Sequence, residues 1–150
     1  VVEYGYNTCT LDETPKSTMV ARLSSDINRI NPQIVYIPHE GDIHSDHKVV
    51  HEVSLASLKW FRHPSIKIVR VYETLSETNL LGNNTFIPNQ FSNIGPYVDK
   101  KIEAMSVYQG EMGDYPFPRS EKSIRALANY RGAHSGCENA EAFQVLFEKL

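Results

Sequence analysis

Four of the six histidines in this sequence lie between positions 39 and 51, in a segment that also carries acidic side chains. Its centre reads Asp42-Ile43-His44-Ser45-Asp46-His47. Imidazole and carboxylate groups are the usual ligands of catalytic zinc, which takes three protein ligands and keeps one position for water. The pattern therefore predicts a metal-dependent hydrolytic site, and the alternative interpretation is a polar surface loop with solvated histidines.

The order of these residues suggests different tasks for them. His47 stands at the start of a predicted helix, where the helix dipole disfavours an imidazolium, so we expect a neutral ring that can bind a metal. Asp46 could orient a neighbouring imidazole. His44 precedes His47 by three residues and could face the same bound water. Asp42 is expected to orient the loop or to contact a sugar hydroxyl, and the alternative interpretation is an Asx-type turn after Gly41.

The other histidines are weaker candidates. His39 is expected to be a solvated residue of the surface loop. His51 lies one helical turn after His47 and could be a ligand by this spacing, but we favour an exposed or supporting position for it. His63 and His134 stand alone in the sequence and are expected to be structural.

The segments around this loop predict how it is positioned. Apolar residues recur at helical spacing over residues 15–30, and a β-branched and aromatic run over 34–37, ended by Pro38, predicts a buried strand. Residues 39–45 then form a loop, and a helix is expected over 46–60. Alternating helices and strands indicate a parallel sheet, whose ligands bind at the carboxyl ends of the strands.

The sequence predicts a mixture of helices, strands and irregular segments after residue 60. Ser120 is expected to cap a helix that ends at Arg131, with Gly132 as its C-terminal cap. The final apolar run over 142–146 is equally compatible with a strand and a helix. The remaining expected elements are a strand over 66–72, an extended edge or irregular segment over 86–91 and a helix over 97–109.

Composition narrows the class of protein. The 150 residues correspond to about one domain, and 41% hydrophobic and 22% charged residues are typical of a globular chain. A net charge of −3 argues against a nucleic-acid partner, and no apolar run reaches the length that a bilayer requires. Cys9 and Cys137 form no metal or redox pair, so we expect a reducing, cytoplasmic environment.

The segment Gly41-Asp42-Ile43-His44-Ser45-Asp46-His47 resembles the second metal motif of the PIG-L/LmbE-like zinc-dependent N-deacetylases. The resemblance extends over nearly the whole chain, in the same order of motifs. Its further matches are Leu11-Asp12, residues 32–38, Tyr72 to Thr78, Pro88 to Phe91, Lys101 to Met105 with Tyr108-Gln109, Pro116 to Ser120, Arg131-Gly132 and Ala140 to Phe143.

The resemblance implies a Rossmann-like, three-layer α/β domain with a mostly parallel sheet, and hydrolysis of an N-acyl group, usually acetyl, from an amino sugar or its conjugate. It implies that His47 binds Zn²⁺, that His44 protonates or polarises the tetrahedral intermediate, and that Asp46 holds His44 by a hydrogen bond. Another divalent metal could take the place of zinc. Zinc lowers the pKa of its bound water to ~7 and polarises the amide carbonyl.

One motif of the family has no counterpart in this sequence. The family's His-Pro-Asp-Asp-Glu segment supplies two further ligands and the general base, and no His-x-Asp-Asp occurs in the 150 residues. We therefore expect residues 1–150 to be the C-terminal part of a single deacetylase domain that is N-terminally incomplete here. This piece is expected to bind zinc weakly and to be inactive alone.

Two other functions remain open on the sequence. The histidine segment also resembles that of metallo-β-lactamase-fold hydrolases, although Asp42 stands where their first histidine would be and few histidines follow. A non-catalytic carbohydrate-binding or assembly domain that kept the loop is the alternative from another class. The expected partner is a small N-acetylamino-sugar-type substrate, and the sequence leaves a homo-oligomer open.

Overall fold

The computed structural model of the chain describes residues 1–78, 80–81 and 84–150. The chain forms two compact units, one of Val1–Phe86 with Val145–Leu150 and the other of Ile87–Gln144. Four strands form one mixed sheet in the order β1-β2-β4-β3. This confirms an α/β protein, and the expected preponderance of parallel strands is not confirmed.

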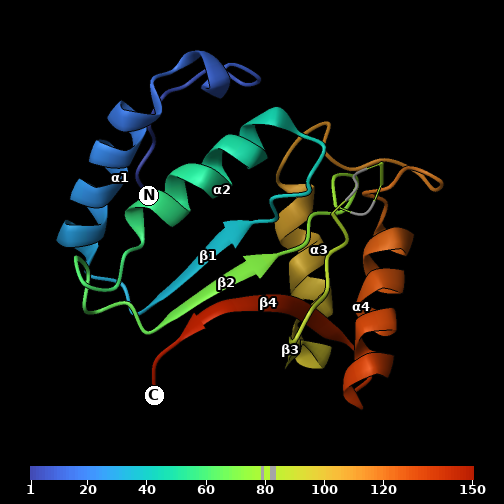
Figure 1. Cartoon of the computed structure of the whole chain (residues 1–150). Helices are drawn as coiled ribbons and strands as arrows, with labels where there is room; N and C mark the ends of the chain where they lie inside the picture. The colour runs from blue at the N-terminus through green and yellow to red at the C-terminus, as the bar shows by residue number, and fades with distance from the viewer. Residues whose placement is uncertain (79, 82–83) are drawn as a thin grey trace. The chain divides into compact units, whose positions relative to one another are not determined.

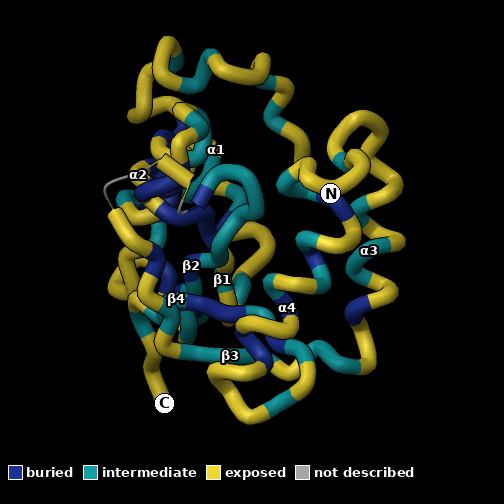
Figure 2. Tube along the Cα trace, turned by 90° about the vertical axis from the view of Figure 1, so that its right-hand side faces the viewer, coloured by how far each residue is buried: buried dark blue, intermediate teal, exposed yellow. Residues whose placement is uncertain are grey.

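The first unit contains the parallel strands β1 (Ile34–Pro38) and β2 (Ile68–Tyr72), with Ile34 opposite Ile68 and Pro38 opposite Tyr72. Both carboxyl ends therefore meet at one edge. Helix α1 (Lys16–Ile30) contacts α2 (Ser45–Ser57), and α2 packs on β1 (Figure 1). Met19 of α1 and Val49 and Val53 of α2 form a buried hydrophobic cluster in this helix layer. Figure 2 shows the buried stretch along α2.

The helix predicted over 15–30 is confirmed with a shift of one residue at its start. Pro15 occupies the N-cap position and α1 begins at Lys16. At the other end Asn31 adopts a left-handed φ of 54°, and its amide donates to the carbonyl of Ile27. Pro32 follows and cannot continue the helix, because its ring disfavours the preceding helical conformation.

Strand β1 is less buried than its apolar sequence predicts. Ile34 and Tyr36 are 43% and 48% exposed, whereas Ile37 and Pro38 are buried. The reason is the position of β1 at one end of the strand order. The buried carboxyl end of the strand is the part that leads directly into the histidine loop.

The second unit pairs its strands in the antiparallel sense. Strand β3 (Gln90–Asn93) lies against β4 (Ala140–Glu148), with Gln90 opposite Phe143 and Asn93 opposite Ala140. Strand β4 resolves the ambiguity of residues 142–146, and its end continues into the first unit. The remaining elements are the 3₁₀ turns η1 (Leu11–Glu13) and η2 (Gly95–Tyr97) and the helices α3 (Val98–Ser106) and α4 (Glu121–Ser135).

Helix α4 begins as predicted and ends later. The Ser120 hydroxyl accepts a hydrogen bond from the Ser123 amide at 3.2 Å, as an N-cap does. The C-terminal cap is Gly136 with φ 73°, so the expected cap at Gly132 is wrong. Gly132 is instead a buried helical residue whose Cβ would lie 2.5 Å from the carbonyl oxygen of Glu138. A glycine is needed there because the returning chain passes against the helix.

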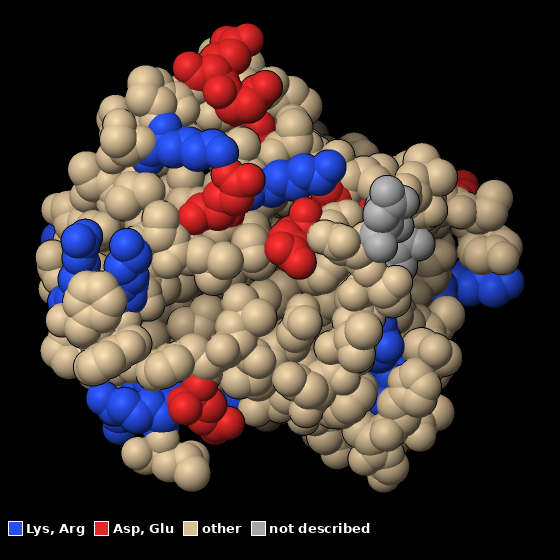
Figure 3. Space-filling model, in the orientation of Figure 1, with Lys and Arg blue, Asp and Glu red and all other residues tan. Residues whose placement is uncertain are grey.

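Charged side chains and helix hydropathy describe the surface of the molecule and the character of its helices. Basic and acidic side chains are interspersed on the face in Figure 3, and no field of one sign formed by the described residues covers it. None of the helices in residues 1–78, 80–81 and 84–150 is long and apolar enough to cross a membrane.

Replacement of Gly132 by alanine tests the close contact between α4 and the backbone of residues 137–138. The added methyl group would meet backbone carbonyl groups of Cys137 and Glu138, which cannot rotate away. Overpacking costs about 1–3 kcal/mol, and the better helix propensity of alanine offsets about 1 kcal/mol of this. We expect a net loss of unfolding free energy in urea. Gly95→Ala, whose Cβ would meet only the Asn93 side chain, is the control, and equal stabilities of the two variants would contradict this account.

Candidate active site

The loop between β1 and α2 lies at the carboxyl ends of the two parallel strands, as predicted. The Ile43 amide donates to the carbonyl of Glu77 at 3.2 Å, which ties the loop to the turn after β2. Gly41 is approached so closely that a Cβ would lie 2.6 Å from the Asn84 carbonyl oxygen. The loop is therefore held by contacts to the chain that follows β2.

Asp42 is completely buried and faces His47. Its Oδ2 atom is 2.8 Å from His47 Nδ1, and its Oδ1 atom accepts a hydrogen bond from the Thr78 hydroxyl. Since an ionised carboxylate only accepts, the His47 ring carries its proton on Nδ1. The Nε2 atom of the neutral ring then keeps its lone pair. Of the two roles expected for Asp42, positioning fits this geometry, because its carboxylate has no exposed surface for a substrate hydroxyl.

The pKa of His47 is shifted upward, whereas the sequence predicted a downward shift and a neutral ring. The hydrogen bond that the ring donates to Asp42 raises the pKa of the imidazole above its usual value, and burial opposes this only in part. The helix-dipole argument for a depressed pKa was thus wrong in direction, because the contact with the carboxylate outweighs it. The same contact makes the ring a better ligand, since a carboxylate partner raises the basicity of a metal-binding imidazole.

His44 is held in the other tautomer. It is the N-cap of α2, and its Nδ1 atom accepts a hydrogen bond from the Asp46 amide at 3.2 Å. A backbone amide can only donate, so Nε2 carries the proton. The ring stacks on His47 with centroids 5.0 Å apart and planes at 23°. The loop therefore presents two neighbouring imidazoles, His47 with a lone pair on Nε2 and His44 with an N–H at Nε2.

The Asp46 carboxylate has partners that the sequence did not predict. It accepts hydrogen bonds from the amides of Cys9 at 2.7 Å and Leu11 at 3.2 Å. The expected bond between this carboxylate and the His44 ring is replaced by the bond from the Asp46 backbone. Asp46 thus fastens the segment before α1 to the start of α2.

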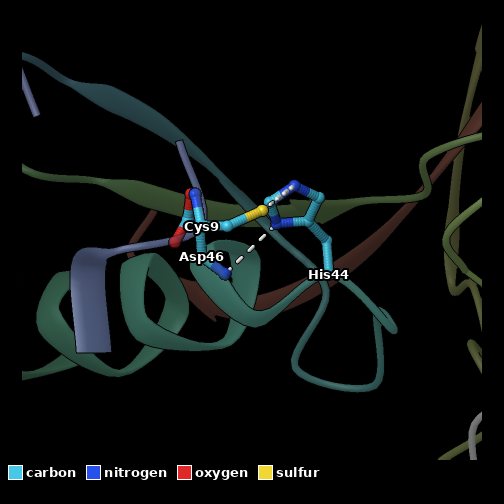
Figure 4. Close-up of side chains that lie close together, drawn as sticks. All are labelled: Cys9, His44 and Asp46. Atoms are coloured by element: carbon cyan, nitrogen blue, oxygen red, sulfur yellow. Dashed lines mark hydrogen bonds between the residues drawn. The ribbon is translucent and has the colours of Figure 1, made fainter. Parts of the chain in front are cut away.

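Cys9 is the neighbour that sequence reasoning missed. Its thiol lies 3.8 Å from His44 Nε2, and Cys9, His44 and Asp46 offer donor atoms within 4.8 Å of one another (Figure 4). Cys9 has a left-handed φ of 60°, which no signal in its local sequence indicates. As a metal ligand, His44 Nε2 would have to lose its proton and the ring its cap bond, so a metal fits His47 better than this cluster.

His39 and His51 are buried, which excludes exposed positions for them. His51 Nδ1 lies 2.8 Å from the Pro38 carbonyl, to which it donates. His39 Nδ1 accepts from the Gly41 amide at 3.0 Å, and burial lowers the pKa of this ring. Both rings therefore stabilise the backbone of residues 38–41 through hydrogen bonds. Of the two isolated histidines, His63 is buried and His134 packs on the Tyr130 ring.

No protein-family model matches the sequence, and no curated protein matches it. Solved structures do match. The N,N'-diacetylchitobiose deacetylase from Pyrococcus horikoshii has a TM-score of 0.71 at 18% identity, over 94% of this chain and 55% of that chain. The conserved protein TT1542 from Thermus thermophilus has a TM-score of 0.67 at 21% identity, over 89% of this chain and 60% of that one. The chain thus shares their fold and spans less than two thirds of either.

Replacing Asp46 by alanine tests its link to the N-terminal segment. Both amides that the carboxylate binds would lose a charged acceptor, and such bonds contribute about 1.5–3 kcal/mol. We expect amide hydrogen exchange at Cys9 and Leu11 to accelerate by about tenfold or more. Asp12→Ala removes an exposed carboxylate from the same segment and serves as the control. Unchanged exchange at both amides in the Asp46 variant would show that the link does not order this segment.

Proposed function

We propose that this chain is the C-terminal part of a metal-dependent N-deacetylase domain of the PIG-L/LmbE-like type. It would remove an acetyl or other N-acyl group from an amino sugar or a sugar conjugate. The carrying observation is the pair of stacked imidazoles, of which His47 Nδ1 faces the Asp42 carboxylate and His44 Nδ1 faces the backbone amide of Asp46 at the start of α2. The likeness to a solved chitobiose deacetylase supports a deacetylase-type hydrolase.

His47 is the residue of this chain that would hold the metal, through Nε2. A bound zinc ion would supply an activated water and a Lewis acid for the acyl carbonyl. Asp42 would keep the ring in the required tautomer, as carboxylates do for metal-bound histidines. His44 would donate its Nε2 hydrogen bond to the oxygen that gains charge when the amide carbonyl is attacked. Asp46 would keep His44 in place through the backbone at the start of α2.

The remaining ligands and the general base are proposed to come from polypeptide that precedes residue 1 in the native protein. A catalytic zinc requires three protein ligands, and this loop offers one that fits. The share of the two solved structures that this chain covers is consistent with that proposal. Zinc, a small N-acetylated amino-sugar substrate and a cytoplasmic location are parts of the same proposal.

Variants of the two stacked histidines separate their roles. In the complete native protein we expect His47→Ala to lose the metal, because it removes a ligand. His44→Ala is expected to keep the metal and to lose about 100-fold or more of the turnover, because it removes one oxyanion donor. Metal content is measured by elemental analysis, and turnover as acetate release from N-acetylated amino sugars.

His134→Ala is the matched control, since it removes an exposed imidazole from the second unit and should change neither quantity. Retained turnover in both loop variants would refute the assignment of His44 and His47. Binding of an amino sugar without acetate release by the complete wild-type protein would favour the non-catalytic carbohydrate-binding function instead.

The 150-residue chain alone gives a second test. With His47 as its one proposed ligand, it should bind zinc at micromolar concentration or more weakly in a chelator competition, because each missing ligand lowers the affinity. The Cys9→Ser variant should bind equally weakly, since the Cys9 thiol faces an N–H of His44. Nanomolar binding by the wild-type chain would contradict the proposal that the other ligands lie outside it.

A further inference from the structure

The Thr78 side chain binds Oδ1 of Asp42, whereas His47 binds Oδ2. Thr78 is 8% exposed and lies in the turn that follows β2. Its Oγ1 atom accepts from the Thr74 amide at 2.8 Å and donates to Asp42 Oδ1. Since the amide can only donate and the carboxylate can only accept, the direction of both bonds is fixed.

Backbone hydrogen bonds hold the turn that carries Thr78. The amides of Glu77 and Thr78 both donate to the Thr74 carbonyl, at 3.1 and 2.9 Å. The Glu77 carbonyl in turn accepts from Ile43, the residue after Asp42. The turn therefore makes two hydrogen bonds to the loop, one through the Glu77 carbonyl and one through the Thr78 hydroxyl.

We propose that Thr78 is a positioning residue for the metal ligand, acting through Asp42. This inference rests on the proposed function of His47. The Asp42 carboxylate is fully buried, so no solvent can replace a missing donor on Oδ1. Without the Thr78 hydroxyl, the carboxylate would be free to rotate toward other donors. His47 would then lose the fixed acceptor that holds its proton on Nδ1 and leaves Nε2 for a metal.

Three threonine variants test this assignment in the complete native protein. Thr78→Val removes the hydroxyl at nearly constant volume, and Thr78→Ser restores it. Thr74→Val is the matched control in the same turn, because the Thr74 hydroxyl is buried without a hydrogen-bond partner among the described residues and its amide remains. Zinc affinity is measured by competition with a chromophoric chelator. The His47 tautomer is measured independently from its ring nitrogen resonances by NMR of the metal-free protein.

We expect Thr78→Val to bind zinc about 3–10-fold more weakly, somewhat less than the 10–100-fold that direct partners of a ligand contribute. We also expect it to populate the Nε2–H tautomer of His47. The zinc affinities of Thr78→Ser and Thr74→Val should stay within about twofold of the wild-type affinity. A merely structural role would leave the tautomer unchanged. If Thr78→Val does not fold, Thr78→Cys replaces it, with a smaller loss in the same direction.

The outcomes separate this inference from the function on which it rests. If His47→Ala weakens zinc binding while Thr78→Val matches Thr74→Val in affinity and tautomer, the positioning role is overturned and the deacetylase proposal stands. If His47→Ala leaves zinc binding unchanged, His47 is not a ligand and the proposed function itself fails.

Discussion

The buried carboxylate of Asp42 is the point on which the geometry of the loop depends. It accepts one hydrogen bond from the Thr78 hydroxyl in the turn after β2 and one from the His47 ring in the first turn of α2. A buried charge without such partners would cost several kcal/mol, roughly 3–5 when one partner of a pair is removed. The Asp42 carboxylate thereby links the loop after β1, the turn after β2 and the start of α2. The parallel register of β1 and β2 is what places these elements at the same edge.

The sequence predicted this edge because the relevant signals are local. Apolar periodicity and Asn31-Pro32 specify α1, and the run at Ile34 followed by the polar loop specifies the end of β1. The residue types of the loop also gave His44, His47 and Asp46 as candidates. The same local signals misplaced the end of α4, because Gly132 is required by a passing chain segment rather than by a cap.

What the sequence could not supply are the contacts between distant segments. Asp42 and Thr78 are separated by 36 positions, and Cys9 and Asp46 by 37. No periodicity or motif relates such pairs, so the partner of each carboxylate was unknown or wrong before the structure. The direction of the His47 pKa shift failed for another reason. Asp42 stands only five positions before His47, but the sequence does not show that its carboxylate turns toward the ring, and this contact raises the pKa of His47.

The cap at the start of α2 also limits what His44 can do. A ring whose Nδ1 atom accepts from the Asp46 amide is neutral, because an imidazolium has no acceptor. In this state it can offer the Nε2–H bond to a developing oxyanion, but to deliver that proton it would have to take up another one at Nδ1. That uptake would break the cap bond, which is worth about 0.5–2 kcal/mol. Under the proposed function, this geometry therefore favours hydrogen-bond stabilisation by His44 over full proton transfer.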